Sequence, residues 1–163
     1  MFERIFPRQF DNVYRGYRVG LWLFVPILLL ELTIGFNSMV ATRLVATTAD
    51  GIPLDRFGGG GAEMVISLFA LMGLCRFLLA LQGVLVLVRY RAMIPIMYLL
   101  FLMLHLGTKA LDMLHPTAST GAASSQKGSL VIVSIIAMLL VGFVLSILRI
   151  GSPNRSLTQG ARP

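Results

Sequence analysis

Five ionisable residues stand inside long apolar stretches of this chain, where charged side chains are rare. They are Glu31, Arg76, His105, Lys109 and Asp112. A carboxylate, a guanidinium and an imidazole inside a hydrocarbon layer can carry protons or bind an ion. They can also be structural, because a buried acid–base pair with a histidine donor fixes the order of helices in a small bundle. The residue types alone leave both interpretations open.

The depth of these residues along their apolar stretches separates them into two groups. At ~1.5 Å per helical residue, Arg76 falls near the membrane midplane, with His105 ~3 Å and Glu31 ~5 Å outward of it. An ion pair between Glu31 and Arg76 is therefore expected, with His105 at a similar depth. Lys109 and Asp112 continue along the His105 face toward the outer surface, and their i,i+3 spacing permits a separate pair.

Four apolar stretches must position these residues, at about 19–36, 64–88, 92–114 and 130–150. Each is close to the ~20 residues that a helix needs to cross ~30 Å of hydrocarbon. The runs are continuous rather than alternating, which argues against membrane β-strands. Overall, 56% of the chain is hydrophobic and only 13% is charged. The sequence predicts an all-α membrane protein, with four transmembrane helices forming an antiparallel bundle in residues 19–150.

Basic residues outside these stretches gather on one side of the predicted membrane. They precede the first stretch (Arg4, Arg8, Arg15, Arg18), fill the second turn (Arg89, Arg91) and follow the last stretch (Arg149, Arg155, Arg162). Because cytoplasmic loops are enriched in Lys and Arg, both termini are predicted to be cytoplasmic, in a membrane of the bacterial inner-membrane type. This topology accounts for the net charge of +7, so no nucleic-acid partner is expected.

The remaining segments flank the spans. In residues 1–18, aromatic and aliphatic side chains recur at helical spacing with arginines between them, which predicts an amphipathic cytoplasmic segment in the lipid interface. Residues 151–163 are polar and basic and predict a disordered cytoplasmic tail. The four glycines at 58–61 are expected to form a flexible hinge before the second span.

Small residues on the second span predict a helix-packing face. Gly73, Ala80 and Gly83 fall on one side of a helix, together with Arg76. Such a face lets another helix approach closely. It can pair with a second copy of the chain, giving a homodimer, or with another span of its own chain.

Cofactor chemistry has little support in the sequence. Haem ligation usually requires two histidines on facing helices, but only His105 is deep, because His115 stands at a helix end. Met103 is a possible second ligand, although methionine is also ordinary core filler. Cys75 is the single cysteine, so it can form no internal disulfide, and we expect it in the core. No cofactor or metal is expected.

These patterns favour a non-enzymatic function. The leading hypothesis is a small accessory or scaffold subunit that acts through helix contacts within the bilayer, with a homodimer or a membrane complex as its assembly. The alternative is a proton-coupled transporter of small solutes in which Glu31 and His105 titrate. A membrane redox or haem protein is the third hypothesis.

Overall fold

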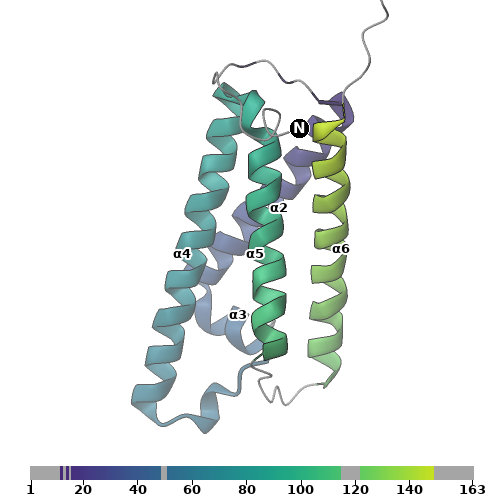
Figure 1. Cartoon of the computed structure of the whole chain (residues 1–163). Coiled ribbons are helices and arrows are strands. Elements are labelled where there is room, and N and C mark those ends of the chain that lie inside the picture. Colours follow the sequence, from purple (N-terminus) through teal and green to yellow (C-terminus); the bar gives the residue numbers. More distant parts are fainter. Residues whose placement is uncertain (1–11, 13, 15, 49–50, 115–121, 149–163) are drawn as a thin grey trace, which may run out of the picture.

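The computed structural model of the chain describes residues 12, 14, 16–48, 51–114 and 122–148. This part of the chain is helical and contains no strand. Four long helices lie side by side (Figure 1): α2 (Arg18–Val40), α4 (Gly59–Arg89), α5 (Ile94–Leu114) and α6 (Ala122–Ile147). The shorter elements are α3 (Thr42–Thr48) and the 3-10 turns η1 (Leu54–Arg56) and η2 (Arg91–Met93).

All four long helices are long and apolar enough to cross a membrane. The mean hydropathy of their most apolar 18-residue windows lies between 1.6 and 3.0. The expected number of candidate spans is therefore confirmed, and their length and composition indicate a location in a membrane. The predicted amphipathic segment 1–18 lies largely outside the described residues, and the predicted tail 151–163 lies entirely outside them.

The prediction of a glycine hinge at 58–61 is wrong, because α4 already begins at Gly59. The Gly58 carbonyl accepts hydrogen bonds from the backbone N–H groups of Gly61 and Ala62, at 2.8 and 3.1 Å. These bonds close the first helical turn ahead of the apolar run. The connection before α4 also contains the short helix α3, which the sequence did not predict.

The core lies where the inward faces of α2, α5 and α6 meet. On α2 the buried residues recur every three or four positions, at Gly20, Phe24, Ile27, Leu28, Glu31, Gly35 and Ser38. The corresponding face of α5 buries Ile94, Met97, Tyr98, Phe101, Leu102 and His105. The Phe24 ring meets the Tyr98 ring edge-on, with 5.2 Å between centroids. One helical stripe on each of α2 and α5 therefore carries both the apolar core and an ionisable residue.

Tyr98 links α5 to two neighbouring helices. Its hydroxyl donates a hydrogen bond of 2.7 Å to the Gly20 carbonyl of α2. On α6, Gly142 leaves room for the ring, because a Cβ there would lie 2.3 Å from a ring carbon of Tyr98. The backbone N–H of Tyr17 also donates to the Leu145 carbonyl, so the start of α2 meets the end of α6.

Helices α2 and α4 are in backbone contact through glycines. A Cβ on Gly35 would lie 2.7 Å from the Phe77 backbone nitrogen, and one on Gly73 would lie 2.7 Å from the Met39 backbone nitrogen. Only glycine permits so close an approach at these positions. The two helices are therefore held at a short distance along the part of their length that carries Glu31 and Arg76.

The predicted small-residue face of α4 is covered by its own chain. Gly73, Ala80 and Gly83 are all buried, with Gly73 against α2. A Cβ on Gly83 would meet Leu28 of α2, and Phe101 of α5 lies nearby. Helices of the same chain therefore cover this face, which is the second of the two arrangements expected for it.

The outer surface of α4 is apolar and open. Only 11% of its apolar window is buried, compared with 39% of the window that contains α5. Cys75 lies on this surface, so the expectation that it is a core residue is wrong. Cys75 lies two residues after the buried Gly73, and the rotation of about 100° per helical residue turns it away from the bundle.

An intramembrane network of Glu31, Arg76 and His105

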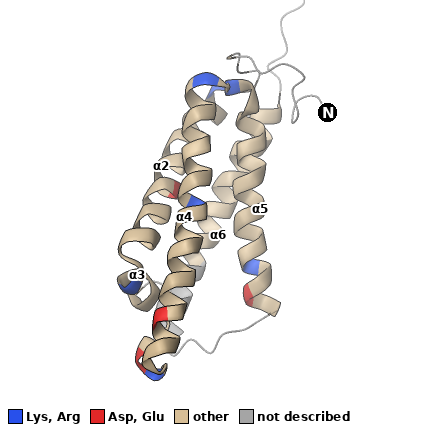
Figure 2. Ribbon diagram, turned by 90° about the vertical axis from the view of Figure 1, so that its left-hand side faces the viewer, with Lys and Arg blue, Asp and Glu red and all other residues tan. Residues whose placement is uncertain are grey.

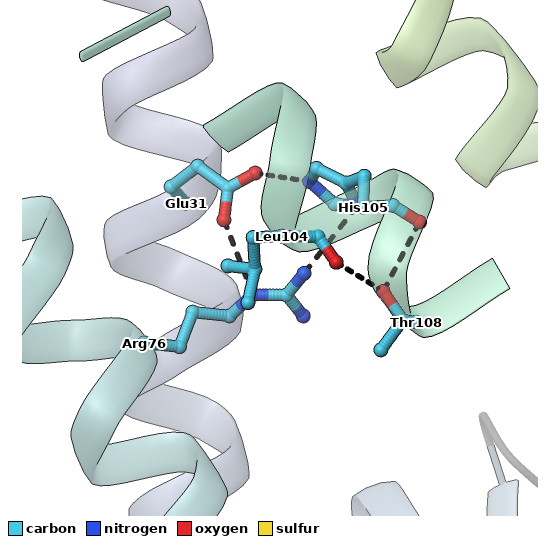
Figure 3. Close-up of polar contacts among 5 residues, drawn as sticks. All are labelled: Glu31, Arg76, Leu104, His105 and Thr108. Atoms are coloured by element: carbon cyan, nitrogen blue, oxygen red, sulfur yellow. Dashed lines mark hydrogen bonds and ion pairs between the residues drawn. The ribbon is translucent and has the colours of Figure 1, made fainter. Parts of the chain in front are cut away.

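Three of the five predicted site residues point toward one another from three helices (Figure 3). The Glu31 carboxylate of α2 contacts the His105 ring of α5, with 2.5 Å between Oε1 and Nε2. Its second oxygen, Oε2, lies 3.2 Å from Nε of Arg76 on α4. Arg76 Nη2 completes the ring with a long contact of 3.4 Å to His105 Nδ1. We call this closed set of three contacts the Glu31–Arg76–His105 network.

The packing of the helices brings these side chains together. Glu31 lies one turn after Leu28 and one turn before Gly35 on the buried stripe of α2. Arg76 stands between Gly73 and Ala80 on the corresponding stripe of α4, where the close backbone approach carries its guanidinium to α2. Figure 2 shows an acidic position of α2 beside a basic position of α4 about half way along the bundle.

His105 enters the network from the end of the aromatic core. It lies one turn after Phe101 and is 3% exposed, while the Glu31 side chain is fully buried. The Arg76 side chain remains 22% exposed. Arg76 is therefore the member of the network with the most exposed side chain.

The hydrogen bonds define where the proton of His105 resides. Arginine can only donate, so His105 Nδ1 must accept the contact from Arg76. In the neutral ring the proton then lies on Nε2, which donates it to Glu31 Oε1. A carboxylate, a guanidinium and a neutral imidazole sum to zero charge. Charge balance and mutual hydrogen bonding both lower the energy needed to keep these groups out of water.

One contact of the network lacks hydrogen-bond alignment. Glu31 Oε2 and Arg76 Nε are buried and approach to 3.2 Å, yet neither makes an aligned hydrogen bond within the described part of the chain. They form an ion pair by distance alone. The attraction between them is Coulombic, and it does not fix the orientation of the guanidinium.

The other two predicted site residues lie apart from the network. Lys109 Nζ is 4.0 Å from Asp112 Oδ2, and the Asp112 side chain is 64% exposed. The i,i+3 pair is thus present, but it sits on the last part of α5, where most side chains are exposed. Thr108 belongs to neither group, because its hydroxyl donates to the Leu104 and His105 carbonyls of its own helix.

No group of three or more His, Cys, Asp or Glu residues suited to a metal ion occurs among the residues that the structure describes. Met103, the possible haem ligand, is 62% exposed and faces away from the buried stripe of α5. His115 lies outside the described residues. The geometry around His105 offers acid–base partners rather than soft ligands.

Sequence reasoning missed two residues that shape this site. Gly35 follows Glu31 by one turn on the same face, a spacing that signals close approach by a helix beside the carboxylate. Tyr98 lies on the same buried face of α5 as His105, but its bond to Gly20 depends on the rotation of two helices, which the sequence does not give.

Comparison with family models, with curated proteins and with solved structures found no match to this chain. The class of protein is therefore defined by its helices and by the network: a multi-helix membrane protein with a buried, charge-balanced Glu–Arg–His site.

Proposed function

We propose that the chain is a non-enzymatic accessory or scaffold subunit of a membrane complex, and that the Glu31–Arg76–His105 network is its internal lock. The observation that supports this proposal most strongly is the closure of the network. Each of the three side chains contacts the other two, their formal charges sum to zero, and Glu31 and His105 are buried. A lock of this kind fixes the order and rotation of α2, α4 and α5.

The proposal includes an antiparallel four-helix topology with both termini and the Arg89–Arg91 turn in the cytoplasm of a bacterial cell. The bond between Tyr17 and Leu145 joins the start of α2 to the end of α6. Lys and Arg gather at the turn between α4 and α5, whereas the other end of α4 carries both signs (Figure 2). The positive-inside rule then favours the cytoplasm for the more basic end.

The surface that would meet a partner is the outer face of α4. It is the least covered of the four spans, and it presents large apolar side chains such as Leu71 and Leu78, which are 56% and 51% exposed. A helix of another subunit can pack there without disturbing the network, because Arg76 and the small-residue face point the other way.

Photo-crosslinking in native membranes tests this function. A photoreactive residue at Leu78 of α4 is compared with one at Leu140 of α6, which is 49% exposed and so equally accessible. We expect a discrete protein adduct from position 78 and only lipid adducts from position 140. If neither position yields a discrete protein adduct, the scaffold function is wrong.

A second candidate is a proton-coupled transporter, favoured by the short contact between two titratable groups. The 2.5 Å separation of Glu31 and His105 allows one proton to be shared between them at membrane depth. Reconstituted vesicles with an internal pH dye separate the two functions. Transport predicts proton uptake that Glu31→Gln abolishes while the protein stays folded, and the scaffold function predicts no uptake above that of empty vesicles.

A further inference from the structure

A hollow of about 450 Å³ lies between the start of α2 and the turn that follows α4. Its lining residues are Tyr14, Gly16, Arg18, Leu21, Trp22 and Arg91. Its volume is in the range of small-ligand pockets, about 300–1,000 Å³. It is distinct from the Glu31–Arg76–His105 network, which shares none of these residues.

The polar part of the hollow carries two arginines from separate elements, and its lining within the described part of the chain contains no acidic residue. The Arg18 side chain makes no hydrogen bond or ion pair with another described residue. Arg91 Nε donates to the Leu87 carbonyl at 3.1 Å, which leaves its two terminal amino groups for another acceptor. The first turn of α2 also contains no acidic side chain that would offset its positive dipole end.

Tyr14 adds no negative charge to this site. Its phenol oxygen is buried, and desolvation by burial raises the pKa of Tyr14 to about 12. The phenol is therefore neutral at physiological pH, and its ring forms a wall. The charge of the described lining is that of the two guanidinium groups.

The other part of the hollow is apolar and continues onto the membrane-facing side of α2. Trp22 is 74% exposed at the beginning of this span, where tryptophan commonly marks the boundary between lipid and water. Leu21 lies beside it. A ligand that fits both parts has a phosphate at one end and a hydrocarbon chain at the other.

We infer that this hollow binds one anionic phospholipid, with its phosphate between Arg18 and Arg91 and an acyl chain along Trp22. Guanidinium groups recognise phosphate through paired, charge-assisted hydrogen bonds. Basic pockets between membrane helices on the cytoplasmic side are typical sites for anionic headgroups. A free phosphate would leave the apolar part of the hollow unused, so the occupant is a lipid.

Trp22 is the only tryptophan, so its fluorescence reports directly on this site. The full-length protein is reconstituted in phosphatidylcholine bilayers that contain a small fraction of lipid with brominated acyl chains, which quench nearby tryptophan. We expect brominated phosphatidylglycerol to quench Trp22 at a lower mole fraction than brominated phosphatidylcholine. Each of Arg18→Gln and Arg91→Gln should weaken this preference about fivefold, the effect of one basic residue near an anionic surface.

Matched variants separate a specific site from general charge attraction. Arg43→Gln with Arg56→Gln removes two arginines at the other end of the chain's helices and should leave the preference unchanged. Arg18→Lys with Arg91→Lys retains the charge and should keep most of it, which also shows that changes at these positions preserve the fold.

Three results would overturn the inference. The first is equal quenching by both brominated lipids. The second is an equal loss of preference in a variant that combines Arg18→Gln with Arg91→Gln and in the one that combines Arg43→Gln with Arg56→Gln, which would indicate net charge alone. The third is displacement of brominated phosphatidylglycerol by millimolar inorganic phosphate, which would assign the site to free phosphate.

Discussion

His105 is the residue that turns an ion pair into a closed network. Without it, Glu31 and Arg76 would share a single unaligned contact, and the guanidinium would have no fixed orientation. The imidazole accepts from Arg76 on one side and donates to Glu31 on the other, so it also ties α5 to the pair. A neutral side chain with one donor and one acceptor on opposite sides is what this position requires.

The tautomer of His105 can be measured directly. In a His115→Gln variant with ¹⁵N-labelled histidine, a single imidazole remains. Nitrogen NMR at neutral pH should show one protonated ring nitrogen, Nε2, and one bare nitrogen, Nδ1, because Arg76 cannot accept a hydrogen bond. A proton on Nδ1, or on both nitrogens, would mean that the contact with Arg76 is absent.

Replacing His105 by leucine should destabilise the protein much more than a similar change one turn away. His105→Leu leaves a buried acceptor on Glu31 and a donor on Arg76 without partners, at about 1–3 kcal/mol for each group. Lys109→Leu removes only an exposed ion pair, worth about 0–1 kcal/mol. The free energies of unfolding of both variants are compared in mixed micelles, and equal values would rule out a stabilising role for His105.

Much of this site is predictable from residue positions along the chain, and the remainder is not. Rise per residue placed Glu31, Arg76 and His105 at similar depth, and the structure contains the expected Glu31–Arg76 ion pair. Depth in the membrane does not give the rotation of one helix relative to another. The sequence therefore did not predict that His105 contacts both Glu31 and Arg76. Lys109 and Asp112 lie on the same face of α5 as His105. They remain apart from the network because most side chains in this last part of α5 are exposed.

The close contact of α2 and α4 depends on two glycines from different helices. Gly35 packs on the backbone at Phe77, and Gly73 packs on the backbone at Met39. Arg76 can reach Glu31 because these contacts keep the two helices close together. Packing between the elements and charge pairing within the network are therefore coupled.

A single methyl group at Gly73 should disturb this contact. The added Cβ would lie 2.7–2.8 Å from backbone atoms of Ser38 and Met39, which cannot move aside, so Gly73→Ala should destabilise by about 1–3 kcal/mol. Gly107→Ala on α5 is the control, because no atom beyond its chain neighbours and the nearby backbone of its own helix lies within 4 Å of that Cβ. It should be neutral or stabilise by up to about 1 kcal/mol, since alanine favours the helix. Equal stability of the two variants would show that α2 and α4 are not in backbone contact.

Hydropathy and length predicted the four spans, because lipid requires ~20 apolar residues in a helix whatever the tertiary packing. The element ends were harder to predict. The glycines before α4 are weak helix formers, but continuing the hydrogen-bonded turn outweighs their propensity. Cys75 was misplaced because hydrophobicity does not distinguish a core-facing position from a lipid-facing one.

The proposed topology assigns opposite sides of the membrane to two regions of the chain. In a Cys75→Ser background, Asp55→Cys in η1 and Ser156→Cys after the last span provide single labelling sites. An impermeant thiol reagent added outside intact cells should label position 55 but not position 156, because arginines hold the latter side in the cytoplasm. Labelling of both positions from outside would contradict the topology.

We propose that the Glu31–Arg76–His105 network stabilises the arrangement of the helices in the whole molecule. A double-mutant cycle on Glu31 and Arg76 tests this role most directly. Glu31→Leu and Arg76→Leu should each lower the free energy of unfolding by about 3–5 kcal/mol, since each strands a buried charge. The double variant should regain much of that loss, retaining about 1–3 kcal/mol for the unpaired imidazole. Single variants as stable as the original chain, or losses that simply add in the double variant, would contradict the lock.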